Sequence, residues 1–204
     1  MLAVDVAIEV RGYVNGRDLV MARGTASRIF AAANVLLNWY EARMPGVSVT
    51  RLTVVIVSPP AQRDDLFGKD RVLGRVGQPG VRAYVRYDRI VRLARKRHTD
   101  VAKLLGAVMA HEIGHLLGES HSTTGVMAAT VDARPSADSR FTPAQELAIR
   151  ATLSRSAVAV SGRDAARPSS AGSRFDSGEP PTADGRDRAV DEVQLALYND
   201  EGRN

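Results

Sequence analysis

Three of the four histidines of this chain lie within eleven residues, in the segment HEIGHLLGESH from His111 to His121. In an α-helix each residue advances by about 100° and about 1.5 Å, so His111 and His115 project from neighbouring turns on one side of the helix. Two imidazoles placed in this way can bind one metal ion. The spacing therefore predicts a helix through this segment that holds both rings towards a common point.

A third ligand is needed, and a continued helix would carry His121 away from the first two. Gly118 lacks a Cβ and can take a positive φ, which would end the helix sharply and return His121 to the same ion. Three neutral imidazoles suit Zn²⁺ with the fourth position open to water, as in catalytic sites. The chain has no cysteine, so it offers no thiolate to close a structural zinc site. We therefore expect one catalytic Zn²⁺ on His111, His115 and His121.

Glu112 follows the first of these histidines and points to one side of the expected ion. There its carboxylate can hold a metal-activated water without becoming a ligand, so we interpret Glu112 as the general base. Glu119, within the same segment, is interpreted as a solvated turn residue. His98, the remaining histidine, is expected to be exposed near the start of the helix.

The longer segment HEIGHLLGESHSTTGVM resembles the zinc signature of the metzincin metalloproteases, HExxHxxGxxH followed by a Met-turn. Met127, six residues after His121, matches the methionine of that turn, which in the family forms an apolar floor beneath the zinc. His121 is followed directly by Ser122, and this pair resembles the matrixin branch of the family. The resemblance implies a zinc endopeptidase that hydrolyses peptide bonds in a peptide or protein substrate, with Glu112 passing the proton of water to the leaving amine.

Hydrophobic periodicity predicts the order strand, long helix, three strands, helix and C-terminal helix, which points to an α/β sheet. This order is similar to the metzincin catalytic domain. The resemblance implies an α/β (α+β) fold with a twisted mixed sheet of four to five strands, a long backing helix, an active-site helix and a C-terminal helix. The predicted strands span 6–14, 47–60 (central, because LTVVIV is apolar on both faces), 72–76 and 81–87. The predicted helices run from a cap at Asp18 to before Pro45, from Thr99 or Asp100 to Gly118, and from Thr142 through FTPAQELAIRATL.

The resemblance also implies how a substrate would bind. In metzincins the peptide lies extended along an edge strand, and pairs through backbone hydrogen bonds. The segment Val72–Val76 is our candidate for that edge. The small and polar segment after Met127, AATVDARPSADSR, would wall the main selectivity pocket, but its residues do not identify a substrate.

Three other hypotheses compete with this one. A zinc-stabilised module could bind peptides or a partner without catalysis, and another metalloprotease class would use a downstream glutamate such as Glu146 as third ligand. The net charge of +5 would also suit a nucleic-acid binder. No nucleic-acid module accompanies that charge, so no nucleic-acid partner is expected, and the basic run RIVRLARKRH (89–98) is interpreted as a solvated helix face.

Composition divides the 204 residues into two parts. We expect residues 1–157 to form the catalytic domain and residues 158–204 to be a disordered polar tail, rich in Ser, Gly, Pro, Asp and Arg, in which 189–198 could form a short helix. No signal peptide and no apolar run of transmembrane length is visible. Metzincins are commonly exported, so the resemblance makes secretion an expectation.

Overall fold

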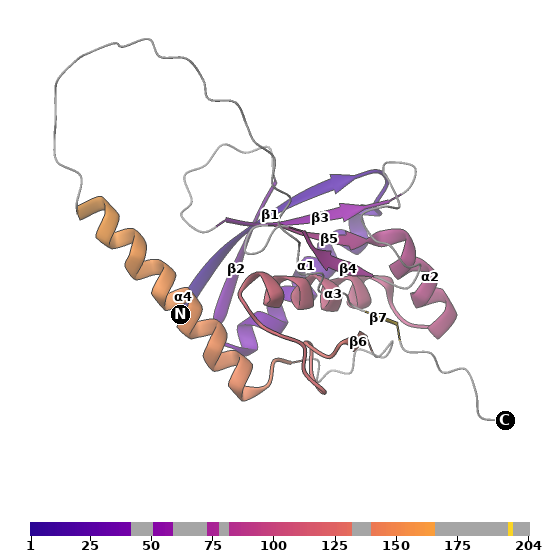
Figure 1. The fold of residues 1–204 in the computed structure, drawn as a ribbon. Helices are drawn as coiled ribbons and strands as arrows, with labels where there is room; N and C mark the ends of the chain where they lie inside the picture. The colour runs from indigo at the N-terminus through magenta and orange to yellow at the C-terminus, as the bar shows by residue number, and fades with distance from the viewer. Residues whose placement is uncertain (42–50, 59–72, 78–81, 132–139, 166–195, 198–204) are drawn as a thin grey trace, which may run out of the picture.

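The computed structural model describes residues 1–41, 51–58, 73–77, 82–131, 140–165 and 196–197 (Figure 1). The strands are β1 (Leu2–Arg11), β2 (Val35–Glu41), β3 (Arg51–Val57), β4 (Gly74–Val76), β5 (Arg82–Arg86), β6 (Thr130–Val131) and β7 (Ala196–Leu197). The helices are α1 (Gly16–Ala32), α2 (Tyr87–Arg97), α3 (Val101–Leu116) and α4 (Pro143–Ala165).

Five of the strands form one mixed sheet in the order β2-β1-β3-β5-β4. The neighbours β2, β1, β3 and β5 are parallel, and β4 runs antiparallel to β5 at the edge of the sheet. β3 occupies the centre, where Val54, Val55 and Ile56 are fully buried. The predicted fold class is therefore confirmed, and so is the central place of the LTVVIV strand.

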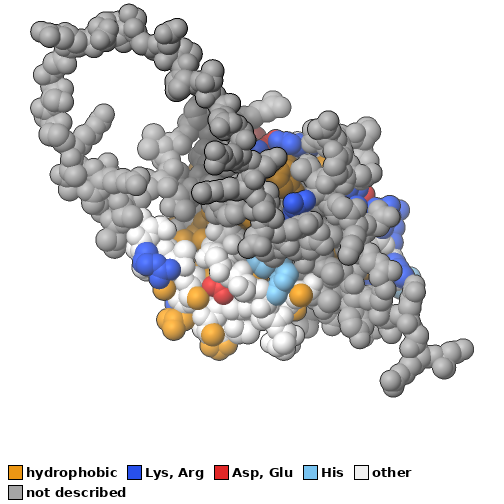
Figure 2. All heavy atoms as spheres, viewed as in Figure 1, with side chains coloured by type: hydrophobic (Ala, Val, Ile, Leu, Met, Phe, Trp, Pro, Cys, Tyr) orange, Lys and Arg blue, Asp and Glu red, His pale blue; other side chains and the backbone are white. Residues whose placement is uncertain are grey.

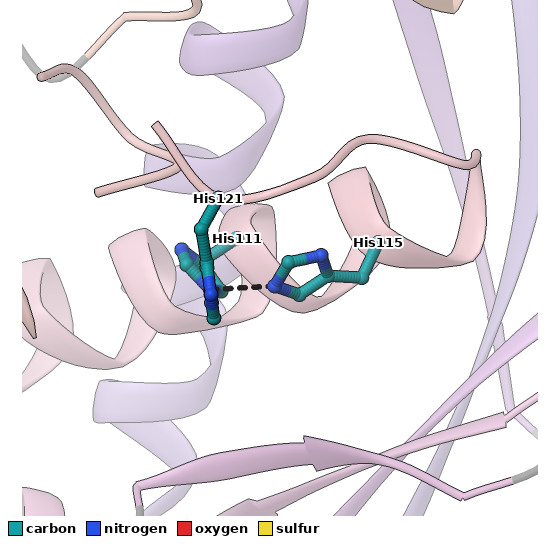
Figure 3. Close-up of side chains that lie close together, drawn as sticks. All are labelled: His111, His115 and His121. Carbon is teal, nitrogen blue, oxygen red and sulfur yellow. Dashed lines mark hydrogen bonds between the residues drawn. The ribbon is translucent and has the colours of Figure 1, made fainter. Parts of the chain in front are cut away.

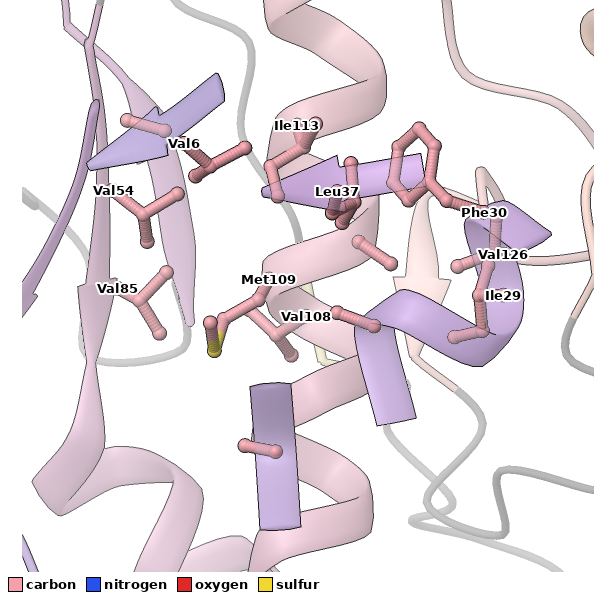
Figure 4. Packing of buried hydrophobic residues seen from close by; sticks show 14 of the residues in the cluster. Val6, Ile29, Phe30, Leu37, Val54, Val85, Val108, Met109, Ile113 and Val126 are labelled. Carbon is pink, nitrogen blue, oxygen red and sulfur yellow. The ribbon is translucent and has the colours of Figure 1, made fainter. Parts of the chain in front are cut away.

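The hydrophobic core lies between one face of this sheet and the helices α1 and α3 (Figure 4). Val6, Val54 and Val85 contribute from three strands, Phe30 from α1, and Ile113 from α3. The two helices pack closely on each other, and α3 also contacts β3, β4 and β5. This packing fixes α3, which carries the histidine motif, against the half of the sheet that ends in the edge strand β4.

The prediction of one helix from Asp18 to Pro45 is wrong. α1 ends at Ala32, and Val35–Glu41 forms the strand β2. Asn34 lies between them with φ 60°, a left-handed conformation that ends the helix. Burial then alternates, with Val35 and Leu37 inside and Leu36 exposed, as in a strand with one covered face. Pro45 lies outside the described residues.

Capping explains where two of the helices begin. The predicted cap Asp18 is wrong, because Asn15 caps α1 and its side chain accepts hydrogen bonds from the backbone N–H groups of Arg17 (2.9 Å) and Asp18 (3.3 Å). For α4 the predicted capping box is confirmed: Thr142 N donates to Gln145 Oε1 (2.9 Å), and Gln145 N donates to Thr142 Oγ1 (3.4 Å).

The basic run at 89–98 forms most of α2, and its face is only partly solvated. Arg92, Arg95 and Lys96 are exposed, as predicted. Arg89 is only 4% exposed, so its assignment to the solvated face is wrong. It lies one turn before the buried Leu93, and the i, i+4 spacing puts both residues on the face of α2 that packs into the core. His98 is exposed, as predicted, and caps the C-terminus of α2 with φ 50°.

The C-terminal part of the chain is described only in short pieces. α4 continues to Ala165, and the two-residue strand β7 (Ala196–Leu197) pairs in parallel with β6. α4 thus runs through residue 157, the predicted end of the catalytic domain, and β7 is a strand inside the segment 189–198 that was predicted as a short helix. The segments 166–195 and 198–204 lie outside the described residues, so the division into a catalytic domain and a disordered tail stays a prediction. Among the described helices, none combines the length and apolar character needed to cross a bilayer.

Asn34 provides a test of how the chain passes from α1 to β2. Its backbone is left-handed and its side chain is exposed. We expect Asn34→Ala to lower the free energy of unfolding by about 1 kcal/mol, because a Cβ without a compensating polar group is strained there. Asn34→Gly should leave stability equal or higher. Urea denaturation measures both, and equal losses in the two variants would contradict a role for the backbone conformation.

Candidate metal centre

Helix α3 begins and ends with defined caps. Asp100 accepts a hydrogen bond from Lys103 N (2.8 Å) at the start. At the end, Gly118 N donates to His115 O and Glu119 N donates to Gly114 O, each at 3.0 Å. Together with φ 91° at Gly118, these two bonds form a Schellman motif. The helix therefore ends at Leu116, one residue after His115, and the chain reverses at Gly118, the residue that the sequence indicated.

The reversal brings His121 back to the two histidines of the helix (Figure 3). One ligand nitrogen from each of His111, His115 and His121 lies within 4.8 Å of the other two. The ring centroid of His121 is 5.2 Å from that of His111 and 4.7 Å from that of His115. These three side chains could bind a metal ion such as zinc.

The segment after His121 is held in place by its own backbone. Ser122 N donates to Met127 O (2.9 Å), and Val126 N donates to Arg140 O (3.0 Å), which ties the turn to the start of α4. Gly125 takes φ 75°, and a Cβ there would lie 2.6 Å from Arg140 O. The side chain of Ser122 stabilises the same turn, because Ser122 Oγ donates a hydrogen bond to Thr124 O (2.6 Å).

Hydrogen bonds fix the tautomers of the two helical histidines. His111 Nδ1 lies 2.8 Å from Val126 O, and His115 Nδ1 lies 2.6 Å from Glu119 O. A carbonyl only accepts, so each Nδ1 must carry the hydrogen, and in a neutral ring each Nε2 is then a lone pair. The two Nε2 atoms nevertheless face each other at 2.9 Å. A cation is required to make that approach favourable, so the donor set fits a metal ion.

Burial makes a proton unfavourable as the cation between the two Nε2 atoms. Desolvation, followed by the charge of His115, lowers the pKa of His111 to about 3. Desolvation also lowers the pKa of His115 to about 4. Both rings are therefore neutral near pH 7, which is the form that binds a metal.

Glu112 is enclosed beside this cluster. Its side chain is 1% exposed, and neither carboxylate oxygen has a hydrogen-bond partner in the described structure. Burial raises the pKa of this carboxyl well above its usual value. An unpartnered buried carboxyl costs stability, and such groups are concentrated at functional sites.

Met127 packs directly against helix α3. It is fully buried, and a Cβ placed on Gly114 would lie 2.5 Å from its sulfur atom. Gly114 is thus the residue of α3 that lets the methionine approach the helix between His111 and His115. The sequence indicated the methionine, but gave no signal for the glycine of α3 that it contacts.

Among the described residues, the exposure of the three rings increases from His111 to His121. His111 is 1% exposed, His115 is half-buried and His121 is exposed. Histidine side chains reach the surface on the face shown in Figure 2. A ligand on the ion would therefore approach from the side of His121.

Two other glutamates that the sequence pointed to, Glu146 and Glu119, contribute no side chain to the described histidine cluster. Glu146 lies on α4, 3.8 Å from Arg150, and is not part of the described histidine cluster. Glu119 is half-buried, and it takes part through its backbone carbonyl, not its side chain. The carbonyls of Val126 and Glu119 orient two of the rings, and no sequence motif could have identified them, because every residue has a carbonyl.

The lowered histidine pKa values predict how the zinc-free protein responds to acid. A neutral buried imidazole contributes stability above the unfolded pKa of 6.5, and this is lost as the pH falls towards about 4 and about 3. We expect the stability difference between wild type and His111→Gln, both treated with chelator, to shrink by about 1.4 kcal/mol per pH unit between about pH 6 and 4.

Glu112 responds in the opposite direction, because its pKa is raised and its cost grows as the pH rises. The comparison with His111→Gln separates the two effects, since both proteins keep Glu112. Urea denaturation at several pH values measures the difference. A difference that is independent of pH would contradict neutral burial of His111.

Comparisons with known proteins find similarity among solved structures. No family model matches the chain, and no curated protein matches it. The chain is similar to the crystal structure of an archaemetzincin from Methanopyrus kandleri, at 15% sequence identity, over 75% of this chain and 97% of that chain, with a TM-score of 0.48. This gives no support to the matrixin branch suggested by Ser122. The function of the site has to be inferred from its own residues.

Proposed function

We propose that this chain is a zinc-dependent endopeptidase of the metzincin type. The observation that carries the proposal is the pair of Nε2 atoms of His111 and His115, which face each other at 2.9 Å while both Nδ1 atoms are bound to carbonyls. His121 adds a third nitrogen to this set. The buried carboxylate of Glu112 follows the first ligand in the chain.

The chemistry of the donor set supports zinc and catalysis over a structural ion. Three imidazoles form the described cluster, which leaves a fourth tetrahedral position for water or substrate. When bound, zinc supplies Lewis acidity, which polarises a peptide carbonyl and makes a coordinated water more acidic. Glu146 lies elsewhere and would not supply a carboxylate ligand.

Glu112 would transfer the proton in this reaction. Its carboxylate takes a proton from the attacking water and gives it to the amine of the departing peptide. The raised pKa favours the first step, because burial makes the protonated form of this carboxyl more stable than it is in water. Within the described structure neither oxygen is engaged in a hydrogen bond, so the carboxylate would break no protein hydrogen bond when it binds the water or the amine.

The edge strand β4 would bind the substrate. β4 has β5 on one side and is the last strand of the described sheet on the other, so an extended peptide can pair with its outer edge. α3 packs against this strand, which brings the peptide and Glu112 together. The selectivity wall after Met127 includes residues 132–139, which lie outside the described residues.

The proposed domain comprises residues 1–157, with a tail from 158 to 204. Secretion is part of the proposal through the metzincin resemblance. The peptide or protein that is cleaved in nature has to be identified with a peptide library.

Replacement of Glu112 by glutamine tests the proposed activity. We expect purified wild type to hold one zinc ion per chain and to cleave an unfolded protein such as reduced casein, with complete loss in 1,10-phenanthroline. Glu112→Gln should keep the zinc and lose at least about 100-fold in kcat, because the amide cannot accept the proton. Plasma mass spectrometry measures the zinc, and peptide mapping measures cleavage.

Glu119→Gln is the matched control. It removes a carboxylate from the same segment but keeps the backbone carbonyl that binds His115, so zinc content and cleavage should stay at wild-type levels. Wild type that contains zinc but shows no phenanthroline-sensitive cleavage would contradict the endopeptidase and support the zinc-stabilised binding module.

A further inference from the structure

Gly74, the first residue of the edge strand β4, makes an unusually close approach to Glu112. A Cβ placed on Gly74 would lie 2.2 Å from Glu112 Oε1, 2.7 Å from its Cδ and 2.8 Å from its Cγ. These are the three heavy atoms nearest to that position. The glutamate side chain therefore occupies the space that any other residue at position 74 would fill.

The backbone of Gly74 does not itself require glycine. Among the described glycines, positive φ is found at Gly12, Gly118 and Gly125, and Gly74 is not one of them. Gly74 pairs with Val85 in the regular antiparallel register of β4 and β5. An alanine could adopt this extended conformation, so the obstacle to a side chain is the carboxylate of Glu112.

The position of that carboxylate depends on packing. Glu112 is 1% exposed, and neither of its oxygens accepts a hydrogen bond within the described structure. Within the described residues, no hydrogen bond would therefore hold the Glu112 carboxylate in place if a neighbouring atom displaced it. To move from 2.2 Å to the 3.4 Å of ordinary contact, Oε1 or the strand would have to shift by about 1.2 Å.

We propose that Gly74 is a positioning residue, which sets the place of the Glu112 carboxylate between α3 and the edge strand. Its consequence for proton transfer rests on the proposed endopeptidase function. The direct steric relation between the two residues does not depend on that function. The two parts can therefore be tested separately.

A double-mutant cycle tests the steric relation without any activity measurement. We expect Gly74→Ala to lower the Tm of the zinc-loaded protein by on the order of 5 °C, since overpacking a closed site is destabilising. In the Glu112→Ala background the same change should have little effect, because all three nearest atoms are gone. If Gly74→Ala does not fold, recovery of folding in the double variant gives the same support.

Gly106 provides the matched control for this cycle. It is a second buried glycine, where a Cβ would lie 2.5 Å from Thr25 Cβ at the contact of α1 with α3. Gly106→Ala should lower the Tm equally with and without Glu112→Ala. A Gly74→Ala effect that is also independent of Glu112, or failure of both the single and double variants to fold, would overturn the proposal.

Kinetics test the consequence for the reaction. In Gly74→Ala we expect unchanged zinc content, an unchanged KM and a kcat lower by about 100-fold, because a displacement of about 1 Å in a reacting group has an effect of this size. The KM should hold because the added methyl points to Glu112 and not along the strand edge. A wild-type kcat, or a loss that lies in KM or zinc content, would contradict positioning of Glu112.

The outcomes separate this inference from the proposed function. If wild type cleaves no peptide, the endopeptidase proposal fails, but the Tm cycle still shows whether Gly74 positions Glu112. If wild type is active and the cycle shows no coupling, the endopeptidase proposal stands and the inference about Gly74 fails.

Discussion

The chemistry of this molecule depends on two imidazole nitrogens, Nε2 of His111 and Nε2 of His115, which face each other at 2.9 Å. Each of these rings carries its hydrogen on the other nitrogen, Nδ1. The carbonyls of Val126 and Glu119 impose this arrangement, because they accept a hydrogen from Nδ1 of His111 and His115. Lone pairs repel at that distance without a cation between them. Neutral rings, the burial of His111 and the proximity of His121 make a metal ion the fitting partner.

The rest of the fold serves to keep these groups in place. The Schellman motif at Gly118 stops α3 and returns the chain, and the bond from Ser122 N to Met127 O holds the returning segment. Gly114 lets Met127 pack beneath the helix, and Gly74 leaves room for Glu112 beside the edge strand. Glycine thus serves different purposes in the site: at 118 it permits a backbone conformation, and at 74 and 114 it admits a neighbouring side chain.

The sequence was most informative where the chemistry is local. The spacing of His111, His115 and His121 needs only helix geometry and one glycine, and the apolar run in β3 needs only its neighbours, so both were predictable. The turn at Asn34 was not, because Val35, Leu36 and Trp39 fit a helical stripe as well as a strand until the left-handed residue is seen. Arg89 and the ring-orienting carbonyls depend on tertiary packing, for which the sequence has no local signal.

X-ray absorption spectroscopy of the zinc-loaded protein tests the central claim most directly, since it reports the atoms bound to the ion. A site built on His111, His115 and His121 predicts three imidazole nitrogens at about 2.0–2.1 Å and one further oxygen from water. The imidazole contribution should fall by one ligand in His121→Ala and stay at three in Glu146→Ala. A spectrum with two imidazoles, or one that changes with Glu146 and not with His121, would contradict the three-histidine centre.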